Sequence, residues 1–247
     1  MLEQSSTPIR IAMWSGPRNI STAMMRSWGN RADTVVVDEP FYAAYLNATG
    51  IVHPMQQEVL ASQSLDYAQV IKSELENHLP PGKLIQYQKH MTLHMVADID
   101  EDWFIALRHA FLIRSPEEVV ASYGIKRDSV TEDDLGYVKQ KELYDKVVAL
   151  HGSRPPVIDA QDVSNNPRKV LQKLCDYLAV SFDERMLNWA AGPRESDGVW
   201  AAHWYQNVEK STEFVPHKTK ELNLSKEQQW IADQSRPYYQ EMYKHKI

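Results

Sequence analysis

The stretch IRIAMWSGPRNISTAMMRSW, from Ile9 to Trp28, decides how the rest of the chain is interpreted. It opens with a short apolar run, typical of a strand buried in a parallel sheet, and the run stops at the turn residues Ser15, Gly16 and Pro17. After the turn, apolar residues recur at helical spacing from Ile20 to Trp28. The stretch therefore predicts a strand, a tight loop and a helix.

The predicted loop carries the donors of an anion site. Arg18, Asn19, Ser21 and Thr22 fall at the start of the helix, where unpaired N–H groups and the helix dipole favour negative charge. The loop departs from the Walker A pattern, because Ser21 stands where the second glycine belongs and the loop has no lysine. This weakens an ATP or GTP interpretation. For the loop alone, an ordinary strand-to-helix turn remains the alternative.

Composition limits the class of protein. The 247 residues are 43% hydrophobic and 24% charged, without an apolar run long enough to cross a membrane. The net charge of −6 argues against a nucleic-acid partner. A polar N-terminus and a single cysteine, Cys175, favour a cytoplasmic protein. His90 and His94 lack the spacing of a metal motif, so we expect no metal.

Several further strands end at polar residues. The β-branched run 34–37 is followed by Asp38 and Glu39, which we expect near the first loop because ligands bind outside the carboxyl ends of parallel strands. A third strand over 84–87 is followed by His90, a candidate general base since the pKa of imidazole lies near neutrality. His94 is the weaker candidate. A purely structural role remains the alternative for each of them.

The fourth strand, 109–113, ends at Arg114, and a strongly signalled helix start follows at Ser115 and Pro116. Arg114 either pairs with a glutamate of that helix or binds an anion. Ser122 lies about two turns into the helix. A fifth strand at 157–158 ends at Asp159.

The second half of the chain is mainly helical, with helices predicted over 131–150, 166–178, 182–189 and 225–243. Between them, 192–214 has no clear period and is rich in aromatic residues, so we interpret it as a functional loop. Its residues Trp200, His203, Trp204 and Tyr205 are a candidate acceptor wall. The alternation of strands and helices predicts one α/β domain over 1–247, with a mainly parallel central sheet between two helical layers.

Two motifs carry a family resemblance. The loop PRNIST, residues 17–22, resembles the 5′-phosphosulfate loop of sulfotransferases, a P-loop-related family that uses 3′-phosphoadenosine 5′-phosphosulfate (PAPS). The stretch LIRSPEEVVAS resembles the 3′-phosphate motif of that family, and 157–180 resembles its later strand and helix. Within the family, the chain resembles a bacterial and plant group sometimes labelled branched-chain aminotransferase-like more closely than it resembles the animal cytosolic enzymes. The resemblance implies a P-loop NTPase-like topology.

The resemblance also implies residue roles, with PAPS as co-substrate, 3′,5′-adenosine bisphosphate as product and no metal. The residues expected to bind the 5′-phosphosulfate are Gly16, Pro17, Arg18, Asn19, Ile20, Ser21 and Thr22. Arg114 and Ser122 would hold the 3′-phosphate, with Arg194, or Lys210 and Ser211, completing the site. Arg18 would stabilise the leaving phosphate, because arginine stays charged and presents a fork of donors. The base would be His90, which we favour slightly, or Glu39.

The function expected is therefore in-line transfer of a sulfuryl group from PAPS to a hydroxyl or amine of a small-molecule acceptor. One alternative is a P-loop kinase, in which Asp159 would hold Mg²⁺. Another is a non-catalytic nucleotide-binding module. We expect neither a nucleic acid nor a membrane as partner, and a homodimer remains open.

Overall fold

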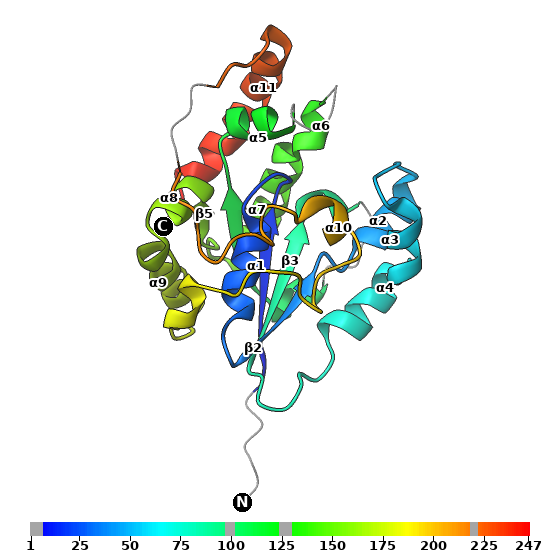
Figure 1. Ribbon diagram of the computed structural model, residues 1–247, viewed down its shortest axis with the longest axis vertical. Helices are drawn as coiled ribbons and strands as arrows, with labels where there is room; N and C mark the ends of the chain where they lie inside the picture. Colours follow the sequence, from blue (N-terminus) through cyan, green and yellow to red (C-terminus); the bar gives the residue numbers. More distant parts are fainter. Residues whose placement is uncertain (1–6, 97–101, 124–129, 218–221) are drawn as a thin grey trace, which may run out of the picture.

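The computed structural model describes residues 7–96, 102–123, 130–217 and 222–247 (Figure 1). Residues 1–6, which contributed to the expectation of a cytoplasmic protein, lie outside these ranges. Within them, no helix combines the length and the apolar character needed to cross a lipid bilayer.

Five strands, all parallel, form one sheet in the order β2-β3-β1-β4-β5. Their bounds are β1 Ile9–Ser15, β2 Thr34–Asp38, β3 Ile85–Met91, β4 Arg108–Ile113 and β5 Val157–Asp159. The opening stretch thus supplies the central strand, with β3 on one side and β4 on the other. The chain runs out to β2 and β3 on one side of β1 and later to β4 and β5 on the other. The loop after β1 therefore lies at the topological switch point, where open α/β sheets bind ligands.

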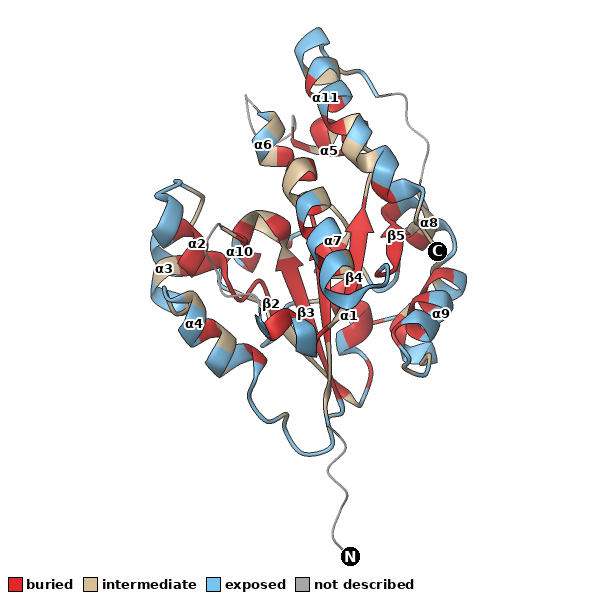
Figure 2. Cartoon of the chain, turned by 180° about the vertical axis from the view of Figure 1, so that it is seen from behind, coloured by how far each residue is buried: buried red, intermediate tan, exposed pale blue. Residues whose placement is uncertain are grey.

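Helices cover both faces of the sheet (Figures 1 and 2). The α-helices are α1 Ser21–Gly29, α2 Tyr42–Thr49, α3 Gln56–Ser62, α4 Tyr67–Val70, α5 Pro116–Tyr123, α6 Glu132–Leu135, α7 Tyr137–His151, α8 Ala160–Asn165, α9 Pro167–Tyr177, α10 Ala201–Trp204 and α11 Lys226–Tyr243. A π-helical turn spans Ile71–Leu75, and 3-10 turns span Thr92–His94, Asp102–Ala106 and Glu184–Leu187.

The two faces of β1 bury different cores, because side chains alternate along a strand. Ile11 and Met13 pack in a cluster with residues of α1 and α9, whereas Ala12 and Trp14 pack on the opposite side with residues of α7. All four side chains are fully buried. These layers confirm the predicted α/β class with a parallel sheet between helices.

Some predicted boundaries were wrong. The helix expected over 131–150 is two helices, because Gly136 takes a left-handed conformation between α6 and α7. The helix expected over 182–189 is only a 3-10 turn. Strand β3 continues to Met91, so that His90 lies within the strand and not beyond it. The sequence of the last helix predicts that Trp230 and Ile231 are both buried, but Trp230 is 59% exposed on α11 and only Ile231 is buried.

Two histidines are part of the core on the α7 side of the sheet. His90 stacks on Trp14 with ring centroids 4.4 Å apart. His109 accepts a hydrogen bond from Trp14 Nε1 at 2.9 Å. Burial, together with neighbouring His109 and Lys89, lowers the pKa of His90 to about 3, and burial lowers that of His109 to about 4. Both imidazoles are therefore neutral in the folded protein at pH 7.

These shifts predict acid sensitivity of the fold. Below pH 6.5 the unfolded chain binds protons at these histidines and the folded chain does not, so stability falls as the pH falls. Between pH 7 and pH 5 each histidine should contribute a loss of about 2 kcal/mol in the free energy of unfolding. Urea unfolding across this range measures it. His90→Phe, which keeps a ring on Trp14 but cannot titrate, should have a shallower slope; a slope equal to that of the wild type would contradict the assignment.

Candidate active site

The carboxyl edge of the sheet gathers the polar ends of its strands. The loop after β1 begins at Gly16, Asp38 ends β2 and Glu39 follows it, and Arg114 follows β4. Two residues here have left-handed backbone conformations without being glycine, Arg18 with φ +55° and Glu39 with φ +41°. Such conformations cost energy and cluster at functional sites. Backbone strain at this edge thus marks two of the three residues that were proposed for chemistry, Arg18 and Glu39 but not His90.

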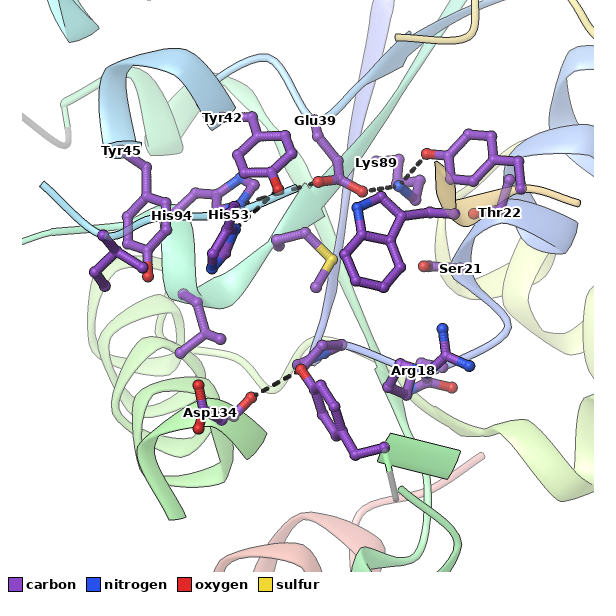
Figure 3. A pocket seen from close by; sticks show the side chains of 18 of the residues that line it. Arg18, Ser21, Thr22, Glu39, Tyr42, Tyr45, His53, Lys89, His94 and Asp134 are labelled. Atoms are coloured by element: carbon purple, nitrogen blue, oxygen red, sulfur yellow. Dashed lines mark hydrogen bonds and ion pairs between the residues drawn. The ribbon is translucent and has the colours of Figure 1, made fainter. Parts of the chain in front are cut away.

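A cavity of about 300 Å³ opens at this edge. Arg18, Ser21 and Thr22 line one side, and Glu39, Tyr42, Tyr45, His53 and His94 line the other (Figure 3). Lys89 lies between them, behind Glu39. The cavity also borders Asp134 and the aromatic residues Trp204 and Tyr205. It is referred to below as the first cavity.

A second cavity, of about 320 Å³, adjoins the first. Arg114, Ser122 and residues of the 192–214 loop line it. Arg18, Asn19, Thr22, Trp204 and Tyr205 border both cavities. The two spaces therefore meet across the loop after β1 on one side and across α10 on the other.

Arg18 and Arg114 are held close together in the second cavity. The Arg18 Nε donates to Ser122 Oγ at 3.0 Å, and Arg114 Nη1 donates to the carbonyl of Arg18 at 2.8 Å. Arg114 also pairs with Glu118 through its Nε, so both roles considered for it are compatible. Burial is the largest cause of a lowered pKa at Arg18, with Arg114 nearby adding to it. Two neighbouring guanidinium groups, with the Ser122 hydroxyl beside Arg18, offer donors suited to an anion with several oxygens.

The start of α1 points donors at the same place. The helix begins at Ser21, and no side chain among the described residues caps it. Asn19 is occupied locally, since its amide donates to the carbonyl of Leu112 and its side-chain oxygen accepts from the N–H of Ile20. Asn19 therefore fixes the shape of the loop against β4, while Ser21 and Thr22 face the first cavity. The first N–H groups of α1 add to the attraction for an anion.

Lys89 is a site residue that sequence reasoning missed. Its Nζ pairs with Asp38 at 2.9 Å and with Glu39, and it bonds the hydroxyl of Tyr205 at 2.8 Å. Its side chain is 1% exposed. Burial alone would lower the pKa of Lys89, but the two carboxylates beside it raise the pKa well above its usual value. The sequence did contain a signal for this role, because Lys89 follows one predicted strand and the carboxylates Asp38 and Glu39 follow another strand of the same parallel sheet.

The 192–214 loop is tied to this cluster and to α1. The hydroxyl of Tyr205 donates to Asp38 at 2.8 Å, and the N–H of Gly198 donates to Asp38 at 3.1 Å. Arg26 of α1, 3% exposed, forms a two-pronged ion pair with Asp197. The loop is therefore fixed over the carboxyl edge, where the sequence placed a functional loop.

Seven predicted residues lie elsewhere. The described residues that line the two cavities do not include Gly16, His90, Asp159, Arg194, Trp200, His203 or Lys210. A Cβ on Gly16 would come within 3.1 Å of the carbonyl of Leu135, so the glycine allows close packing of α6. Arg194 donates to the carbonyl of Ala190 on the loop surface. Asp159 caps α8 and accepts from Tyr239, which leaves the Mg²⁺ role of the kinase alternative without support.

His90 lies on the wrong face of the sheet for the cavity. It is 1% exposed, and its ring packs against Trp14, Phe41 and Trp103. Its Nε2 is hydrogen-bonded to the side-chain oxygen of Gln88 at 3.0 Å. The preference for His90 over Glu39 as base thus finds no support in the geometry, because the side chain does not reach the space where an acceptor could bind.

The buried cluster predicts a large effect of removing its cation. Lys89→Met removes the cation between the two carboxylates and leaves two buried negative charges without a counter-charge, so the free energy of unfolding should fall by about 3–5 kcal/mol. Lys244→Met, which removes an exposed lysine paired with Glu241, is the matched control and should change it by less than about 0.5 kcal/mol. Denaturant unfolding of both variants measures this. Equal losses would mean that the cluster does not stabilise the fold.

Comparison with known proteins places this site in a family. A family model described as "Sulfotransferase domain" matches residues 9–246. Branched-chain-amino-acid aminotransferase-like protein 1 of Arabidopsis thaliana is 34% identical over 232 residues, which are 94% of this chain and 41% of that protein. Protein 2 of the same name is 34% identical over 204 residues, 83% of this chain and 36% of that one. The chain thus spans less than half the length of these relatives.

A solved structure shows the same fold. The sulfotransferase from Alicyclobacillus acidocaldarius superposes with a TM-score of 0.54 at 10% identity, covering 98% of both chains. This similarity confirms the predicted topology. Because the family model covers nearly the whole chain, from β1 to the end of α11, the protein belongs to the sulfotransferase family.

Proposed function

We propose that the protein transfers the sulfuryl group of PAPS to a small acceptor, with the nucleotide in the second cavity and the acceptor in the first. The observation that carries this proposal is the position of Arg18, which borders both cavities and bonds to Ser122 beside Arg114. A group that passes between two ligands must lie where their sites meet. Arg18 is the fixed positive charge at that boundary.

The donor side has the chemistry that PAPS requires. Arg114 and Ser122 offer charged and hydroxyl donors to a 3′-phosphate, and Arg18 with the start of α1 offers them to a 5′-phosphosulfate. Of the loop residues predicted to complete this site, Ser211 borders the second cavity, whereas Arg194 does not. The nucleotide would therefore depend mainly on the two arginines.

The acceptor side offers Glu39 as base. Its carboxylate lines the first cavity, and burial, more than the opposing effect of Lys89, raises its pKa. A raised pKa brings a carboxylate closer to the range in which a general base works best at neutral pH. Arg18 cannot be an acid, because its pKa is too high, but it can stabilise charge that grows on the leaving phosphate. The reaction would be a direct displacement at sulfur without a covalent enzyme intermediate.

Titration with 3′,5′-adenosine bisphosphate by calorimetry tests the proposal. We expect micromolar binding by the wild-type protein and a loss of about 10-fold to 100-fold in Arg114→Ala, since a hydrogen bond to a charged group contributes about 1.5–3 kcal/mol. Arg185→Ala is the control, because Arg185 is exposed and pairs with Asp183 away from both cavities. Its affinity should equal that of the wild type.

Three results would contradict the proposal. Tighter binding of ATP with Mg²⁺ than of the bisphosphate would favour the kinase alternative. If the protein bound none of these nucleotides, the proposed donor site would be wrong. Binding of the bisphosphate by a protein that never consumes PAPS, with any acceptor offered, would identify a non-catalytic nucleotide-binding module.

A further inference from the structure

Glu39 and His94 face each other across a short gap in the first cavity. His94 Nε2 lies 3.9 Å from Glu39 Oε2, too far for a direct hydrogen bond. Both residues line the cavity, and Figure 3 shows them on the same wall. One oxygen atom can lie at about 2.8 Å from each of the two atoms, because their separation is less than the sum of two hydrogen bonds.

The ring of His94 is held firmly in this position. It stacks on Tyr42 at 4.7 Å and on Tyr45 at 4.9 Å, with small interplanar angles to both. The residue is 6% exposed. Its other ring nitrogen, Nδ1, is buried without a hydrogen-bond partner among the described residues. Nε2, which faces Glu39, is therefore the ring nitrogen through which His94 can bind a ligand in the cavity.

The environment also fixes the proton on the ring. Burial, Lys89 and two other histidines lower the pKa of His94 well below its usual value, so the imidazole is neutral and carries one N–H. The carboxylate at Glu39 favours the proton on Nε2, the nitrogen nearest to its negative charge. His94 thus presents an N–H donor beside a carboxylate acceptor.

We propose that His94 is a positioning residue that makes the acceptor site selective for a hydroxyl group over an amine. This inference rests on the proposed transfer from PAPS. The acceptor oxygen lies between His94 and Glu39, accepts a hydrogen bond from His94 Nε2–H and donates its own hydrogen to Glu39 Oε2.

The transfer then balances without another reactant. A lone pair of the acceptor oxygen forms the new S–O bond, and the acceptor proton passes to Glu39. The S–O bond to the 5′-phosphate breaks, and its electron pair stays on the phosphate oxygen beside Arg18. His94 keeps its proton throughout, so it directs the oxygen and takes no part in the proton transfer.

Selectivity follows from the number of lone pairs. A hydroxyl oxygen has two, so one can accept from His94 while the other attacks sulfur. An uncharged amine has one lone pair, which either accepts the hydrogen bond or attacks. A protonated amine has none and would leave His94 Nε2–H facing another donor. The site therefore disfavours both forms of an amine.

A matched pair of probes tests this inference. 4-Methylphenol and 4-methylaniline have the same ring, are both uncharged at pH 7 and differ only in the OH or NH₂ group. Calorimetric titration into protein saturated with 3′,5′-adenosine bisphosphate should show about 10-fold tighter binding of the phenol, the effect of about one hydrogen bond. With PAPS, only the phenol should be sulfated.

Two variants separate positioning from structure. His94→Phe keeps a ring between Tyr42 and Tyr45 but removes the donor, so the preference for the phenol should disappear. His94→Gln restores an N–H near the position of Nε2 and should recover part of it. The affinity for the bisphosphate should be the same in all three proteins, which shows that the variants fold and that the donor site is intact.

The outcomes distinguish the two proposals. Equal binding of the two probes by the wild type, failure of the nucleotide-loaded protein to bind either probe, or a preference that survives in His94→Phe would overturn the role of His94 while the donor site stands. Failure of the wild type to bind the bisphosphate would overturn the proposed function itself, and this inference with it.

Discussion

The ammonium group of Lys89 holds the carboxyl edge of this sheet together. It lies between Asp38 and Glu39 at the end of β2 and touches the hydroxyl of Tyr205 from a loop more than one hundred residues later in the chain. Two carboxylates could not be buried side by side without it, because each ion loses its hydration on burial. The cation therefore permits the carboxylate Glu39 to lie beside a cavity in an otherwise closely packed region.

The cluster of Lys89 and its carboxylates also connects the sheet with the 192–214 loop. Asp38 accepts from Tyr205 and from the N–H of Gly198, so the end of β2 holds two points of the 192–214 loop. A third point is the pair of Arg26 with Asp197. Buried charges need partners at the correct positions, and this requirement gives the loop one defined position although its helix α10 is only four residues long.

Much of the fold could be predicted from the sequence because local signals agreed with one another. The apolar run, turn and helix of residues 9–28, and the capping residues Thr131 and Ser225, specify elements through short-range chemistry, and the structure contains them. The family resemblance assigned Arg18 to the 5′-phosphosulfate and Arg114 with Ser122 to the 3′-phosphate of one nucleotide, and all three residues line one cavity.

What could not be predicted depends on which face of a strand a side chain occupies. The true end of β3 lies at Met91, so Lys89 reaches the cavity and its neighbour His90 is turned to the opposite core. A shift of one residue exchanges the two faces of a strand. Contacts between residues distant in sequence, such as Lys89 with Tyr205, produce no periodic pattern from which they could be predicted.

Trp204 and Tyr205 form part of the wall of both cavities. A molecule that binds in one cavity and displaces this shared wall thereby alters the other. Thermodynamic linkage then makes the influence mutual, since the factor by which the first ligand changes the affinity for the second equals the factor in the opposite direction. If both ligands displaced this common wall, the two cavities would act as one cooperative unit, and the affinity of each ligand would depend on whether the other is bound.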